Sequence, residues 1–292
     1  AAHVMDALSW KRLTVTPGVR VELIRSQLDD YLSGQTTTGS LVAVMPGLGA
    51  FYAITDDFGV LAGVHRGFSP PPPGSEEHIE PEYSINYEAG LRFARKALRA
   101  EVIGYFNDYS NLTDVCTLSS GCLTEDLDRQ FDAGRAHIYG VEAYATHELP
   151  AGPVTIPFTV GYTFTRAIFK NSFQSQDPIY GSVTEGDEIP YVPRNQVSAS
   201  VGVEGKIGGL VAGVTYVSPM REEPGKQPIE ESLHTDEQFL LDVGGRVRVY
   251  GPISLYANAR NVLNSAYIVS RRPYGARPNA PRWIQAGAKV EF

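Results

Sequence analysis

The sequence predicts an all-β fold, a wall of about 13 antiparallel strands that belongs to a transmembrane β-barrel. Three features of the 292-residue chain lead to this prediction: a two-residue alternation of apolar and polar side chains, connections that alternate between short and long, and no helix-period segment of useful length. Alternation with period two is typical of a strand with one apolar and one polar face. No run approaches the roughly 18 apolar residues of a membrane-spanning helix, so strands must do the crossing.

The alternation is clearest at the C-terminal end, RWIQAGAKVEF. Apolar side chains fill every second position there, at Ile284, Ala286, Ala288, Val290 and Phe292. We interpret these five residues as an outer-membrane assembly signal. The same pattern runs through 153–165 (PVTIPFTVGYTFT), 195–205 (NQVSASVGVEG), 239–249 (FLLDVGGRVRV) and 253–260 (ISLYANAR).

Applied along the whole chain, the alternation predicts thirteen strands. In order they are 1–8, 12–25, 41–54, 59–68, 83–94, 97–108, 135–148, 153–167, 194–206, 210–217, 237–249, 252–262 and 282–292. Pro17, Pro46 and Pro157 fall inside these strands, where proline removes a ladder hydrogen bond, so we expect a bulge or a strand end at each.

The connections between these strands alternate in length. The short ones are 55–59, 94–97, 149–153, 206–209 and 250–252, and the long ones are 26–40, 69–82, 109–133, 169–193, 218–236 and 263–281. Short turns on one rim and long loops on the other are typical of outer-membrane barrels. A soluble propeller or sandwich is the alternative, but its strands are shorter and its turns do not alternate in this way.

Charge and cysteines limit the partners. The net charge of −8 argues against a nucleic-acid partner, which requires a basic face. The polar strand faces carry charges that would line a wet lumen, among them Arg20, Glu22, Glu88, Arg92, Arg99, Glu101, Glu142, Arg246 and Arg248. Cys116 and Cys122 flank a polar Ser-Ser-Gly stretch, and we expect them to form a small disulfide loop; two free thiols are the alternative.

Thirteen strands cannot close by antiparallel pairing, and an open edge leaves unpaired backbone groups in lipid. The opening residues AAHVMDALSW also lack the basic and apolar regions of a signal peptide. We therefore expect residues 1–292 to be the downstream part of a larger barrel.

Several segments together resemble a known family. The segments are LTVTPGVRVELI (13–24), GVLAGVHRGFSPPPPG (59–74) with EPEYSINYEAGLRF (80–93), GYFNDYSNL (104–112) with IYGVEAYATHEL (138–149), and NARNVLNSAYIVS (258–270) with the C-terminal strand. Together they resemble TonB-dependent outer-membrane receptors, in the ferric-citrate and ferric-siderophore branch. The motifs follow the family's order over nearly the whole chain.

This resemblance implies a 22-stranded barrel around an N-terminal plug, of which the chain holds the C-terminal barrel portion without plug, first strands or TonB box. It implies TonB-dependent import of a ferric chelate, a location in the bacterial outer membrane, and contacts with the rest of the barrel and plug, the TonB complex and lipopolysaccharide. No catalytic motif is present, so we expect neither enzyme activity nor a cofactor or bound metal.

Anionic, oxygen-rich chelates favour arginine and tyrosine contacts. The candidates, where strands enter the long loops, are Arg66, Arg166, Arg221, Arg271, Arg272 and Tyr274. For each, the alternatives are a salt bridge within the loops or a contact to lipopolysaccharide phosphates. For the whole chain, the alternatives to import are a structural subunit of an outer-membrane assembly and a passive porin.

Overall fold

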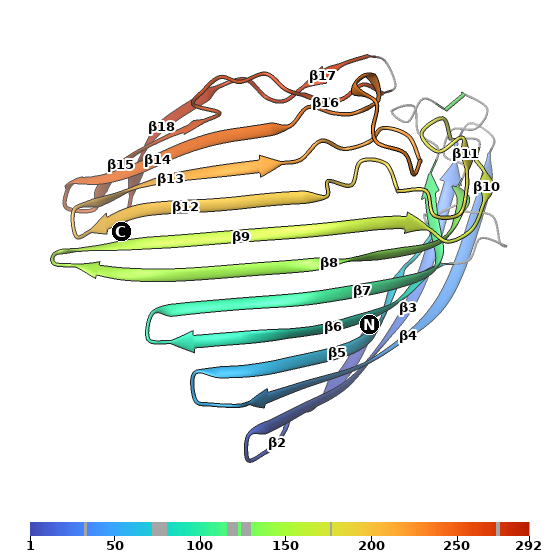
Figure 1. The fold of residues 1–292 in the computed structure, drawn as a ribbon, viewed down its shortest axis with the longest axis horizontal. Coiled ribbons are helices and arrows are strands. Elements are labelled where there is room, and N and C mark those ends of the chain that lie inside the picture. Colours follow the sequence, from blue (N-terminus) through green and yellow to red (C-terminus); the bar gives the residue numbers. More distant parts are fainter. Residues whose placement is uncertain are drawn as a thin grey trace.

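The computed structural model describes residues 1–31, 34–71, 81–115, 122–123, 130–175, 177–272 and 275–291. Its main feature is one antiparallel sheet in which each strand pairs with the next along a path of thirteen strands (Figure 1). The path runs through β1 (Ala2–Met5), β3 (Leu13–Asp30), β4 (Gln35–Ala53), β5 (Phe58–Ser69), β6 (Glu82–Arg95), β7 (Leu98–Val115), β8 (Gln130–Ala151), β9 (Val154–Phe169), β12 (Asn195–Gly205), β13 (Gly208–Val217), β14 (Gln238–Tyr250), β15 (Ile253–Arg260) and β18 (Trp283–Val290). The predicted meander is confirmed.

The long connections contain small elements of their own. Two short hairpins, β10 (Phe173–Gln174) with β11 (Ser182–Val183) and β16 (Ile268–Ser270) with β17 (Arg277–Pro278), lie in them together with a 3-10 turn, η3 (Glu231–Leu233). Figure 1 shows these connections gathered at one end of the sheet and the short turns at the other. Among the described residues, no helix has both the length and the apolarity to cross a membrane.

The first predicted strand, 1–8, is two strands. β1 and β2 (Leu8–Trp10) both pair with β3, and their register is continuous from Met5 opposite Gly18 to Leu8 opposite Val15. The interruption lies opposite Pro17, which has no N–H to donate, while Asp6 N still donates to the Pro17 carbonyl at 3.2 Å.

The other two prolines also lie where strand pairing is lost. Pairing between β4 and β5 stops at Gly47, beside Pro46. Pairing between β9 and β12 skips the positions of Pro157 and Gly202 and resumes in the same register. Pairing therefore ends at Pro46, while Pro17 and Pro157 interrupt it locally, and none of the three shifts the register as a bulge would.

The register divides the side chains between two faces of the sheet. One face carries the apolar rows, and its large side chains are exposed: Leu48 is 48%, Val201 49% and Leu255 46% accessible. We term this the outward face. The connection that follows β9 folds over the opposite, inward face, where its Val183 and Ile189 pack with Phe169 in the small buried core.

The inward face is the charged one, as predicted. Arg92 on β6 pairs with Glu101 directly across on β7, and Arg20 pairs with Glu22 along β3. Together with the exposed apolar rows, these pairs give a wall one layer thick, apolar outward and polar inward.

Aromatic residues mark two levels of the outward face. Phe58 lies opposite Phe93 near the short turns, and Phe68 lies opposite Tyr83 near the long connections. On each strand the two aromatics are ten positions apart, which is ~33 Å along a strand and ~25 Å in height at a tilt of about 40°. This is the height of the apolar band of an outer-membrane barrel, whose two edges carry aromatic girdles.

Candidate functional site

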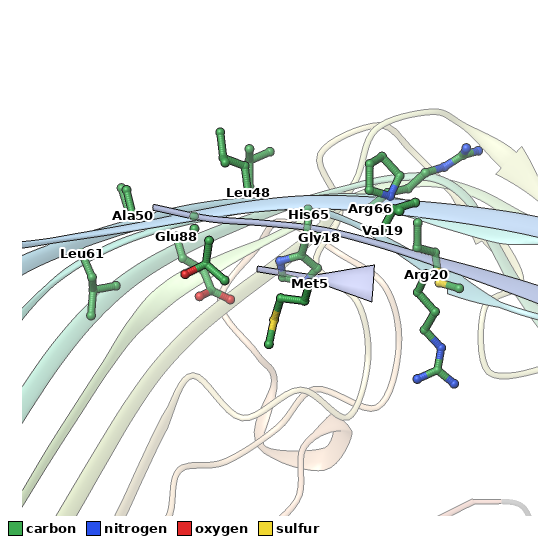
Figure 2. A pocket seen from close by; sticks show the side chains of 18 of the residues that line it. Met5, Gly18, Val19, Arg20, Leu48, Ala50, Leu61, His65, Arg66 and Glu88 are labelled. Carbon is green, nitrogen blue, oxygen red and sulfur yellow. The ribbon is translucent and has the colours of Figure 1, made fainter. Parts of the chain in front are cut away.

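Two features of the wall are candidate functional sites, and the first lies on its inward side. The first is a groove of about 650 Å³ across β1, β3, β4, β5 and β6. Its floor is backbone, because Gly18 and Gly47 face each other between Met5 on β1 and His65 on β5. Figure 2 shows Met5, Arg20, His65 and Glu88 on this side of the sheet, with Leu48 and Ala50 on the other.

The groove depends on its glycines. A Cβ on Gly47 would lie 3.2 Å from the His65 Cβ, and a Cβ on Gly18 would lie 3.5 Å from the Met5 Cγ. Arg20, Glu88 and Arg92 give the groove charges of both signs. These charges lie within a lining that is otherwise mostly apolar.

The second feature is a layer formed by three long connections, 170–194, 218–237 and 261–282, which we term the loop layer. Its centre is Glu188, whose carboxylate serves three arginines. Arg166 Nε lies 3.4 Å from Oε1, Arg221 Nε lies 3.4 Å from Oε2, and Arg194 donates a hydrogen bond to Oε1. The Glu188 side chain is 11% exposed, so its carboxylate is shielded from water.

Arg221 is the most enclosed of the three, with a side chain 10% exposed. Its terminal nitrogens donate to the backbone carbonyls of Glu223, at 3.3 Å, and Gln227, at 2.8 Å. The guanidinium therefore fixes the 218–237 connection and also ties it to Glu188 in the preceding connection.

The third connection joins through Glu222 and Glu223. Glu222 accepts a hydrogen bond from the Arg271 backbone N–H at 2.9 Å and lies 3.8 Å from the Arg271 guanidinium. Arg272 pairs with Glu223 and donates to the Pro178 carbonyl at 2.7 Å. All three connections are thus cross-linked by charge-assisted hydrogen bonds.

The predicted ligand contacts are found in three settings. Arg221, Arg271 and Arg272 belong to the loop layer, Arg166 lies beside it on β9, and all four are paired with carboxylates. Arg66 is on the outward face, beside Tyr83, and Tyr274 lies outside the described residues. The roles of these residues in ligand binding stay predictions. Pairing leaves the Arg221 guanidinium few free donors. The side chains of Arg166 and of its neighbour Arg194, which was not predicted, remain about half exposed, at 48% and 54%.

Glu188 and Arg194 are the residues that the sequence did not single out. Arg194 could have been found, because it is the first residue of the predicted strand 194–206, where that strand meets a long loop. Glu188 could not, since its role depends on contacts between three separate connections.

Other predicted sites fall partly outside the described residues. Cys122 is buried, 6% exposed, with its sulfur 3.8 Å from an Asp177 carboxylate oxygen, but Cys116 is not described, so the disulfide stays a prediction. Along β18, Ile284, Ala286, Ala288 and Val290 pair with the outward row of β15, whereas Phe292 is not described. Among the described residues, no three His, Cys, Asp or Glu side chains are grouped to hold a metal ion.

Comparison with known proteins agrees with this architecture. Residues 1–262 match the family model for the TonB dependent receptor-like β-barrel. The chain is 25% identical over 283 residues to the pesticin receptor of Yersinia pestis, covering 90% of this chain and 36% of that receptor.

Two solved structures share the fold. The ferric-catecholate import receptor Fiu of E. coli K12 aligns with a TM-score of 0.71 at 16% identity, covering 99% of this chain and 44% of Fiu. The ferric citrate transporter FecA aligns with a TM-score of 0.70 at 19% identity, covering 98% and 44%. The chain thus spans less than half the length of these relatives. With the family model matching most of its residues, the chain belongs to the TonB-dependent receptor β-barrel family.

Proposed function

We propose that the chain is the C-terminal barrel portion of an outer-membrane importer that takes up a ferric chelate, either a siderophore complex or ferric citrate. The observation that carries this proposal is the wall itself, apolar outward and charged inward, with a cross-linked loop layer at the end of the sheet where the long connections gather (Figure 1). Family membership supports the same class of activity. The function is selective transport, without covalent chemistry.

The rest of the barrel and a plug would complete the protein, because the aligned receptors are more than twice as long. The free edges of β1 and β18, which do not pair with each other among the described residues, would then pair with further strands. Such pairing satisfies backbone groups that would otherwise be unpaired in lipid. TonB and lipopolysaccharide are the remaining proposed partners.

In this proposal the chelate binds between the plug and the inward and loop-layer side chains. Arg271 and Arg272 of the loop layer are the candidate contacts, because both remain partly exposed, at 27% and 26%, after pairing with Glu222 and Glu223. An anionic chelate would gain charge-assisted hydrogen bonds from them. The plug is then remodelled by pulling from TonB, an energy-driven shift between two states.

Gene deletion in the source bacterium tests this proposal. Uptake of iron-55 is measured with ferric citrate and with a panel of ferric siderophores, with and without a plasmid copy of the gene. The expected result is loss of uptake of one chelate class, restored by the plasmid. Unchanged uptake of every chelate would contradict import. Ion conductance by the intact purified protein in planar bilayers would then favour a porin, and a stable co-purifying envelope subunit would favour a scaffold.

A further inference from the structure

We propose that Arg66 and Tyr83, on the outward face, form a binding site for the phosphate of an outer-leaflet lipid headgroup. This inference rests on the outer-membrane location of the proposed function. It concerns the wall's exterior: Arg66 borders the groove, but its side chain projects from the opposite face of the sheet to His65 and Glu88 (Figure 2).

The Arg66 side chain points to the outward side of the sheet. On β5, Arg66 is two positions from Val64, which lies opposite Leu48 on β4, and both are exposed outward side chains, at 37% and 48%. Figure 2 shows Arg66 on the same side of the sheet as Leu48, opposite to His65 and Glu88. A charged side chain here faces the medium around the barrel.

Arg66 lies close to the upper level of aromatic residues on the outward face. It is two positions before Phe68, which forms the upper aromatic pair with Tyr83, with ring centroids 5.6 Å apart. In an outer-membrane barrel this girdle lies at the boundary between acyl chains and headgroups. The long arginine side chain can therefore keep its stem along the apolar face while its charged end reaches the headgroups.

The Arg66 guanidinium is held in place by its neighbours. Its central carbon lies 4.0 Å from the centroid of the Tyr83 ring, a cation–π contact. One nitrogen is 3.5 Å from the Val44 carbonyl, a long and weak hydrogen bond. The other donors of the planar group remain for an oxyanion, and phosphate matches their geometry.

Arg66 differs from three other arginines of the wall that have carboxylate partners. Arg20 and Arg92 on the inward face have Glu22 and Glu101 as partners, and Arg166 on the outward side has Glu188. Within the described part of the chain, no carboxylate lies within ion-pairing distance of Arg66. A charge facing lipid is unfavourable without an anion, and a lipid phosphate at this level can supply one.

The test is native mass spectrometry of the full-length protein purified from membranes, with defined lipids added. The probes are bisphosphorylated lipid A, the same lipid with both phosphates removed, and inorganic phosphate alone. Variants are Arg66→Gln, Arg66→Lys and Tyr83→Leu. Arg99→Gln is the matched control, because it removes an exposed inward arginine near the short turns.

The expected result is a lipid A adduct that falls about five- to tenfold in Arg66→Gln, partly recovers in Arg66→Lys and is unchanged in Arg99→Gln. Tyr83→Leu should weaken it less than Arg66→Gln. Equal adducts in wild type and Arg66→Gln would overturn the site, as would equal binding of dephosphorylated lipid. Binding of inorganic phosphate as tight as that of lipid A would overturn the lipid as its source.

The same preparations separate this inference from the proposed function. Lipid binding is read on the exterior and requires no chelate, so it survives if iron-55 uptake proves absent. Conversely, normal uptake by Arg66→Gln, with its adduct unchanged, would overturn the lipid site and leave import standing. Circular dichroism of each variant confirms that the barrel is folded before adducts are compared.

Discussion

Glu188 is the residue on which the loop layer depends most. Its carboxylate balances three guanidinium groups, and one of them, on Arg221, is enclosed and anchors the backbone of the next connection. Neutralising the carboxylate leaves an enclosed positive charge without its partner, which is strongly destabilising in protein interiors.

The substitution Glu188→Gln should therefore loosen the loop layer while the wall stays intact. The backbone amides of Tyr191 and Glu222 donate to the carbonyls of Arg221 and Leu233. We expect these amides to exchange roughly 30-fold faster, which corresponds to a loss of about 2 kcal/mol in local stability. Hydrogen exchange followed by mass spectrometry measures this.

Glu185→Gln is the matched control, since Glu185 lies in the same connection, is 61% exposed and pairs only with Lys170 at 3.6 Å among the described residues. Equal protection in the two variants would contradict a central role for Glu188.

Asn261 fixes the last connection in a different way. It is 4% exposed and adopts a φ of 47°, a conformation that asparagine tolerates better than most residues. Its side-chain amide donates to the carbonyls of Ser265 at 2.9 Å and Ala280 at 3.0 Å, and its side-chain oxygen accepts from the Ser265 N–H at 3.0 Å. Its own backbone N–H donates to Asp242 at 2.9 Å.

Asn261→Ala should lower the stability of this connection by about 2–4 kcal/mol, from lost hydrogen bonds and an unfavourable positive φ. Asn261→Gly, which relieves only the φ term, should lie between the wild type and the alanine variant. Exchange at the Ser265 amide reports the effect. If alanine and glycine variants behaved alike, backbone conformation would have no share in it.

At the scale of the strands, local pattern was sufficient where alternation is strong. The predicted strands 59–68 and 83–94 are Phe58–Ser69 and Glu82–Arg95, because each has a clear apolar row, a short turn at one end and the proline-rich connection at the other. The prediction was too short for 41–54, which begins at Gln35, and for 135–148, which extends from Gln130 to Ala151. The extra residues, such as the polar run 35–40, carry no apolar row and extend the strand through backbone pairing with a neighbour.

The faces could have been read further than they were. Counting by two from Val60 and Val64 places Arg66 on the apolar row, and counting from Phe158 and Phe164 does the same for Arg166. The loop layer could not have been inferred, because the carboxylate partners of its arginines come from other connections, as Glu222 does for Arg271.

The assignment of faces predicts different costs for adjacent residues of β12. Val201 faces outward near the strand's middle, and Ser200 faces inward. Val201→Arg should destabilise the folded protein in lipid vesicles by about 2–4 kcal/mol, because it places a charge in hydrocarbon. Ser200→Arg should change stability by less than about 1 kcal/mol, since it faces a wet lumen. Urea unfolding in vesicles measures both, and equal losses would argue against the assignment.

At the scale of the molecule, the chain is a curved wall without a buried core of ordinary size. Apart from the small cluster around Phe169, its large apolar side chains among the described residues are mostly exposed on one face. Such a surface is unfavourable in water and is stabilised where hydrocarbon covers it. The fold, the proposed transport and the proposed lipid site all depend on this orientation.

The most direct test is spin-label accessibility along β6 in the full-length protein in lipid vesicles. Single labels replace Ile85, Tyr87 and Leu91 on the outward face, and Asn86, Glu88 and Arg92 on the inward face. We predict that the outward labels collide preferentially with oxygen, which concentrates in hydrocarbon, and the inward labels with a water-soluble nickel complex. Uniform accessibility along the strand, or the reverse alternation, would contradict the account.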